Sequence, residues 1–168
     1  MFLLLMPLLL SANDSDKASG NFLQSIFPEE VPNSKTLWLE TDIRKQAEEL
    51  VQHPLPMLRV RYWQKGETTA WILQEIGKEK PITFGIVIKN GAILKLEVLA
   101  FRESRGGEIR QPFFTKQFSG AAITTNGKLS QTIDGITGAT LSVGASKRSA
   151  ILALYLDSLV RQESVTAP

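Results

Sequence analysis

The chain has 168 residues, of which 43% are hydrophobic and 21% are charged, a composition typical of one compact globular domain. Its 19 basic and 17 acidic side chains leave a formal charge of +2, too small for the basic surface that a nucleic-acid-binding protein needs. The lack of cysteine excludes disulfides, thiolate zinc sites and iron–sulfur clusters, and the single histidine argues against histidine-based metal sites and Ser–His catalysis.

Residues 1–12 form an apolar leader that is typical of the hydrophobic part of a secretory signal peptide. As a helix, the run MFLLLMPLLL would span only about 15 Å, roughly half of the ~30 Å hydrocarbon core of a bilayer. No basic residue precedes the run, so an anchor at the membrane surface and a buried N-terminal segment are the alternatives. The leader predicts a periplasmic or otherwise extracytoplasmic protein, with membrane association as a further option.

Residues 13–36 are rich in Ser, Asn, Asp, Lys and Pro, which predicts a tether. We expect residues 37–168 to form a single domain. This domain is predicted to open with a short amphipathic helix over residues 42–52, because apolar side chains recur there at helical spacing. Asp42 is the expected cap of this helix, and Pro54 ends it.

Four strands are expected next, over residues 57–101, because apolar and polar side chains alternate along this stretch. Lys65-Gly66 offers the first turn. Asn90-Gly91 is the strongest turn signal of the chain, since a type I′ turn requires a positive φ at both central residues. The spacing of strands and turns predicts an antiparallel meander.

The second half of the chain is less regular. A short helix over residues 112–118 and an edge strand over residues 129–133 are expected, with a turn at Asn126-Gly127 between them. The longest helix is predicted over residues 142–160, and it is apolar around most of its circumference, which is typical of a helix buried on several sides. The predicted class is α+β, with an antiparallel sheet packed against helices and a long C-terminal helix.

The segment most suggestive of chemistry is DGITGATLS, residues 134–142, directly before the long helix. Its glycines allow another group to approach the backbone closely, and a helix N-terminus offers free N–H groups to an anion. The segment carries three hydroxyl groups: Thr137, Thr140 and Ser142. Two basic side chains follow: Lys147 and Arg148. The pattern suits a phosphate near Thr140, and the alternative is an ordinary glycine turn with a Ser/Thr cap.

This stretch resembles the D-x-x-S/T-G-A-T-x-S/T motif of the FMN-binding domain family. Members include FMN-carrying subunits of the sodium-pumping NADH:quinone oxidoreductase and of the Rnf electron-transport complex. In that family a flavin transferase takes FMN from FAD and esterifies its phosphate to the last threonine of the motif. The resemblance therefore implies that Thr140 carries covalent FMN. The other cofactor-binding positions that it implies are Asp134, Gly135, Thr137, Gly138, Ala139, Leu141 and Ser142.

The resemblance covers roughly residues 80–160. The segment 101–120 takes the place of a family loop of E-T-P-G type, although Arg105 stands where proline is usual. Three loop residues are implied, by a looser alignment, to bind the cofactor: Glu103, Gly106 and Gly107. Candidate walls for the flavin ring, with ordinary core packing as the alternative, are Trp71, Phe113, Phe114, Phe118 and Leu141.

The resemblance implies an extracytoplasmic electron-transfer flavoprotein with FMN held through a threonine phosphoester, rather than an enzyme with catalytic residues of its own. Its expected partners are the flavin transferase and membrane or periplasmic redox proteins, such as haem proteins or ferric-reductase-like proteins. One alternative is a flavin-dependent reductase of a small acceptor, a quinone or a ferric chelate. Another is a non-redox binding or assembly module that retains the fold. No G-x-G-x-x-G follows a strand, so direct use of NADH is not expected.

Overall fold

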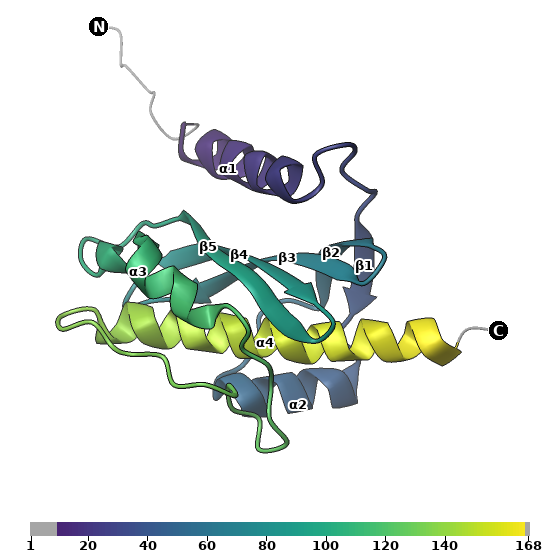
Figure 1. Ribbon diagram of the computed structural model, residues 1–168. Coiled ribbons are helices and arrows are strands. Elements are labelled where there is room, and N and C mark those ends of the chain that lie inside the picture. The colour runs from purple at the N-terminus through teal and green to yellow at the C-terminus, as the bar shows by residue number, and fades with distance from the viewer. Residues whose placement is uncertain (1–9, 167–168) are drawn as a thin grey trace, which may run out of the picture.

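The computed structural model describes residues 10–166, in which one five-stranded antiparallel sheet has the order β1-β2-β3-β4-β5. The strands are β1 (Lys35–Trp38), β2 (Arg59–Lys65), β3 (Thr68–Ile76), β4 (Pro81–Lys89) and β5 (Ala92–Ala100). The helices are α1 (Leu10–Ile26), α2 (Thr41–Val51), α3 (Pro112–Thr115) and α4 (Thr140–Thr166), with 3₁₀ turns η1 (Gly107–Arg110) and η2 (Lys116–Phe118). Figure 1 shows α1 on one face of the sheet and α4 with α2 on the other. The predicted α+β class is confirmed.

The meander is confirmed, with each strand paired to its neighbour in sequence. Asn90 and Gly91 join β4 to β5 with φ values of 52° and 77°, the positive φ at both positions that the turn signal predicts. β1 adds a fifth strand to the four expected. It has only four residues and begins inside the segment predicted as a tether, so it shows too little alternation to be recognised.

The main core lies between the sheet and α4. At its centre Trp71 is fully buried and stacks on Tyr62, with 4.9 Å between ring centroids. The Trp71 indole donates to Thr69 Oγ1 at 2.9 Å, and Thr69 in turn donates to the buried carboxylate of Asp157 on α4 at 2.6 Å. Arg161 pairs with the other oxygen of Asp157 at 2.6 Å. Because unpaired buried polar groups are costly, this chain of bonds fixes the position of α4 on β3.

The segment predicted as a tether, residues 13–36, instead carries most of α1. Phe22 and Leu23 of this helix, together with Phe27 directly after it, are buried against the sheet face that α4 does not cover. Phe22 lies so close to Gly85 of β4 that a Cβ there would be 2.8 Å from three ring atoms. The polar composition of this segment gave no indication of an apolar helix face, because only the last turns of α1 contain large apolar side chains. The leader prediction falls mostly on residues 1–9, outside the described residues.

Three local predictions also differ from the structure. The residue before α2 is Glu40, and it makes no side-chain cap bond, so Asp42 lies inside the first turn rather than at the cap. The expected strand over residues 129–133 is reduced to a single bridge between Ile123 and Leu129. α4 begins at Thr140, earlier than predicted, and is 27 residues long. Within residues 10–166 no helix is long and apolar enough to span a membrane.

Candidate functional site

Thr140 is the first residue of α4, and it is exposed. The preceding loop ends in a tight turn, in which Gly138 has a φ of 82° and the Ala139 N–H donates to Ile136 O at 3.0 Å. The first main-chain bond of the helix runs from Val143 N to Ala139 O at 2.9 Å. The N–H groups of the first helical residues have no acceptor within the helix, and their partial positive charge favours an anion. This end of α4 therefore suits a phosphate group.

The loop after β5 packs directly on the first turn of α4. Gly106 has a φ of 87°, and a Cβ at this position would lie 2.5 Å from Ser142 Oγ. Only glycine permits both this conformation and this approach. Ser142 and Ala139 are buried at the same contact. The structure thus brings together the two segments that the sequence singled out, the motif and the glycine-containing loop.

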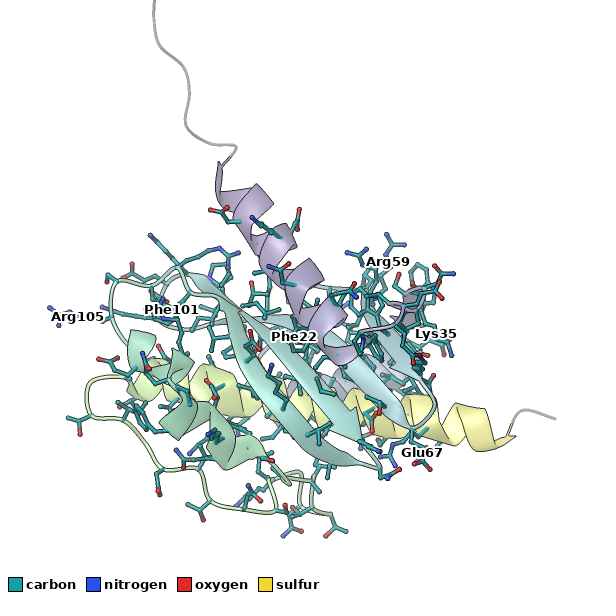
Figure 2. All side chains as sticks on the ribbon, turned by 45° about the horizontal axis from the view of Figure 1, so that its top comes forward. Phe22, Lys35, Arg59, Glu67, Phe101 and Arg105 are labelled. Atoms are coloured by element: carbon teal, nitrogen blue, oxygen red, sulfur yellow. The ribbon has the colours of Figure 1, made fainter. Side chains whose placement is uncertain are left out.

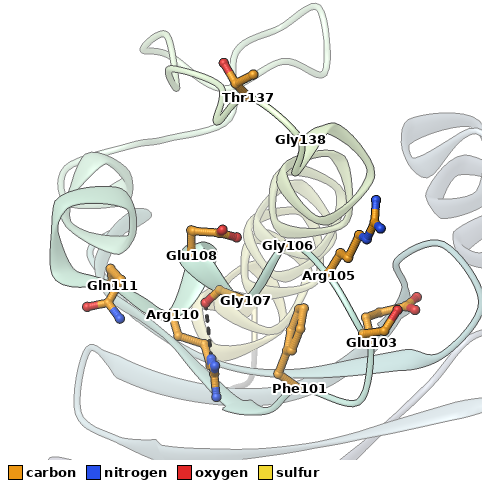
Figure 3. Close-up of a pocket in the computed structure, with 11 residues that line it drawn as sticks. Phe101, Glu103, Arg105, Gly106, Gly107, Glu108, Arg110, Gln111, Thr137 and Gly138 are labelled. Atoms are coloured by element: carbon orange, nitrogen blue, oxygen red, sulfur yellow. Dashed lines mark hydrogen bonds between the residues drawn. The ribbon is translucent and has the colours of Figure 1, made fainter.

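A cleft of about 750 Å³ opens between these two segments (Figure 3). This volume lies within the roughly 300–1,000 Å³ of typical small-molecule sites. The residues that line the cleft are Phe101, Glu103, Ser104, Arg105, Gly106, Gly107, Glu108, Arg110, Gln111, Thr137 and Gly138. Thr140 lies two residues beyond Gly138, at the start of α4, and does not itself line the cleft. The cleft therefore provides room for a flavin beside the loop residues that directly precede Thr140.

Glu103 supports the far wall of this cleft. Its Oε1 accepts three backbone bonds from the β3–β4 turn, from Lys78 N and Glu79 N at 2.6 Å and from Lys80 N at 2.9 Å. The backbone N–H groups of Lys80 and Glu79 hold the pKa of the Glu103 carboxyl below its ordinary value, because they stabilise the charged form. The role of Glu103 in this structure is to anchor the loop that carries Gly106 and Gly107.

Six residues that line the cleft were not predicted as cofactor-binding positions: Phe101, Ser104, Arg105, Glu108, Arg110 and Gln111. The Arg110 guanidinium lies 5.4 Å from the centroid of the Phe101 ring, and its Nε donates to Gly107 O at 3.2 Å. Figure 3 shows both side chains beside Gly107. The position of Phe101 directly after the last strand is a signal that could have identified it, since binding residues often follow strand ends.

The structure separates the predicted ring-wall residues into two groups. Phe114, Phe118 and Trp71 are fully buried, so they are core residues and cannot contact a ligand in the cleft. Phe113 and Leu141 are 64% and 54% exposed and remain accessible, although neither lines the cleft.

Arg148, one of the two basic side chains that follow the motif, binds to the sheet. The Arg148 guanidinium pairs with the buried Glu75 carboxylate at 3.3 Å and donates to Ile76 O at 3.1 Å. Arg148 is thus committed to the sheet, and it does not add free positive charge for a phosphate. Arg105 and Arg110 lie at the cleft itself, with Glu103 and Glu108 beside them.

Of the nine motif residues 134–142, Thr137 and Gly138 line the cleft and the other seven do not. Asp134 and Gly135 are exposed in the loop that leads to the helix, and the Asp134 N–H donates to Gln117 Oε1 at 2.7 Å. A Cβ on Gly135 would meet nothing within 4 Å, so no close approach requires glycine here.

Residues 77–154 match the family model of the FMN-binding domain. NqrC of Shewanella oneidensis has a similar structure, with a TM-score of 0.61 and 11% identity over 87% of this chain and 94% of that chain. The corresponding subunit of the Na⁺-translocating NADH-quinone reductase of Parabacteroides distasonis has a TM-score of 0.53 and 14% identity over 97% and 100% of the two chains. Comparison with the curated proteins gives no match. The shared fold and the family match confirm the resemblance predicted from the motif, and they support FMN as the ligand.

Proposed function

We propose, from the FMN-binding domain at residues 77–154, that this protein is an extracytoplasmic electron carrier with FMN joined to Thr140 through a phosphoester. The observation that carries the proposal is the exposed Thr140 at the start of α4, beside a cleft of about 750 Å³. An attachment residue must be reached by a modifying enzyme, and a buried threonine would not be.

The attachment step makes one bond and breaks another. The Thr140 hydroxyl loses its proton and forms an Oγ–P bond with the FMN phosphate of FAD, while the pyrophosphate bond breaks and AMP leaves with the proton. The product keeps one negative charge on its phosphate. The free N–H groups of the first turn of α4 would stabilise that charge by about 0.3–1 kcal/mol.

The cleft residues fit a flavin ring by their mixed chemistry. Phe101 offers an aromatic face, and the Arg105 and Arg110 guanidinium groups offer hydrogen-bond donors near a ring that carries carbonyl oxygens. When bound, the flavin supplies transfer of one or two electrons, while the protein binds and orients it. A covalent bond would also retain the cofactor outside the cytoplasm, where the apolar leader would direct the chain.

The attachment is tested by mass spectrometry of the protein made together with a flavin transferase and FAD. We expect the wild-type mass to rise by one FMN less one water, and Thr140→Ala to remain unmodified. Thr125→Ala is the matched control, because Thr125 is an exposed threonine that lies outside both the motif and the cleft. It should keep the added mass. An unmodified wild-type chain, or a modified Thr140→Ala chain, would refute the proposal.

A further inference from the structure

The outer edge of β5 is largely free of main-chain partners. β5 is the last strand of the sheet, and Ile93 makes two bonds across this edge, donating to Ala121 O at 2.8 Å and accepting from Gly120 N at 2.7 Å. In the described part of the chain, residues 94–100 make no further main-chain bond to another element on that side. An unpaired edge of this kind is a template for another extended strand.

A groove of about 480 Å³ runs along this edge, between β5 and the segment that contains α3 and η2. Figure 1 shows α3 beside β5. The strand side of the groove is formed by residues 94–98, and the opposite side by Arg110, Pro112, Thr115, Lys116 and Ser119. Leu94 is 56% exposed at one end of it. The groove thus offers strand hydrogen bonds on one side and side-chain contacts on the other, as in recognition of a peptide by strand addition.

The charge of the groove is positive. On the strand side of the groove, Lys95 and Glu97 form a salt bridge at 2.7 Å, so their charges cancel. Arg110 and Lys116 are exposed on the opposite wall, and neither forms a salt bridge with a carboxylate among the described side chains. An acidic segment complements this wall, whereas a second copy of the chain would bring two cationic walls together.

The groove adjoins the candidate flavin cleft at Arg110. Arg110 lines both cavities, and Phe101, the residue that follows β5, lines the cleft. A strand docked on β5 would therefore hold the rest of its protein beside the cleft.

We propose that the β5 groove docks an extended, acidic segment of the redox partner by strand addition. The identification of the docked segment as part of a redox partner rests on the proposed function. The docking chemistry itself depends only on the β5 edge and on Arg110 and Lys116.

The probe is an eight-residue peptide of alternating glutamate and valine, and a lysine–valine peptide of equal length is its counterpart. Titration followed by amide NMR should shift the resonances of residues 94–98 with the glutamate peptide and not with the lysine peptide. Lys116→Glu should weaken binding about fivefold, which corresponds to one surface charge interaction of about 1 kcal/mol. Lys128→Glu, the same charge change in the exposed 124–128 turn, should alter binding by less than about twofold.

Shifts outside the groove, equal binding of both peptides, or equal loss in the two variants would overturn the proposal. If the β5 amide resonances shift with protein concentration in the absence of peptide, the edge pairs with a second copy of the chain. That result would overturn the proposal as well. Each titration is run on samples with and without attached FMN, as measured by mass. An unmodified Thr140 then refutes the attachment and leaves the docking result to be judged separately.

Discussion

Gly106 packs so closely on Ser142 that a Cβ at Gly106 would lie 2.5 Å from Ser142 Oγ. The loop after β5 can reach the first turn of α4 only because Gly106 has no side chain and adopts a φ of 87°. One residue without a Cβ therefore determines how closely the loop after β5 approaches the first turn of α4, and the motif alone does not specify that approach.

Gly106→Ala is expected to lower the free energy of unfolding by about 1–2 kcal/mol from the left-handed backbone alone. The clash of the new Cβ with Ser142 Oγ, at 2.5 Å, should add to this loss and displace the loop. Chemical denaturation measures the stability, and the FMN load is expected to fall in parallel. Gly66→Ala is the control, because its φ of 58° is also positive while its Cβ would lie in open space. Equal losses in both variants would contradict the assigned role of Gly106.

The Glu103 carboxylate links the cleft loop to the β3–β4 turn through three backbone N–H donors. Its pKa is lowered in the folded chain, so the fold binds a proton at this site less readily than the unfolded chain does. The stabilisation is therefore fully present above the ordinary carboxyl pKa of 4.5 and is lost as the pH falls through the lower, folded value.

Glu103→Gln should accordingly reduce the melting temperature at neutral pH, because an amide oxygen is a weaker acceptor than a carboxylate. The difference between wild type and variant should shrink as the pH falls below about 4.5. Thermal unfolding between pH 7 and pH 3 measures it. Glu29 and Glu48, whose pKa values are also lowered, are present in both proteins and cancel in the difference. A difference that is constant with pH would contradict the assignment.

At the scale of elements, α1 covers the sheet face opposite α4 through a small apolar contact centred on Phe22 and Gly85. The helix is polar along most of its length, so its position depends on the few large side chains of its last turns. Figure 2 shows α1 crossing the sheet, with Phe22 beneath it.

Phe22→Ala is expected to cost about 3–5 kcal/mol, as for other buried phenylalanine truncations. The loss should appear as faster hydrogen exchange of α1 amides, while FMN attachment on the other side of the sheet persists. Asn21→Ala is the control, since Asn21 is exposed on the same helix. Protection of α1 that is unchanged by Phe22→Ala would show that another contact holds the helix.

For the whole molecule, the sheet was predictable because its alternation is long and its turns are marked by Asn90-Gly91 and Lys65-Gly66. Each strand pairs with its sequence neighbour, so local signals suffice for the topology. α1 was not predictable from composition, because its polar residues resemble those of a linker. β1 is too short to show a periodicity.

The candidate site was predictable in part. The motif predicted the position of Thr140 and of the helix that begins there, because both depend on one contiguous stretch of sequence. The burial of Phe114 and Phe118 and the approach of Gly106 to Ser142 depend on contacts between distant segments. Sequence spacing carries no information about such contacts, so the cleft wall around Arg110 was found only in three dimensions.

The sequential order of the strands has a consequence for folding. Hairpins between neighbours require closure of short loops only, and such low contact order favours rapid folding. The contact of the β5–η1 loop with α4 instead joins segments separated by the irregular stretch from α3 to residue 139. We therefore expect the sheet to assemble first and the pocket to be completed last, so that under the proposed function a transferase would meet Thr140 in a nearly finished molecule.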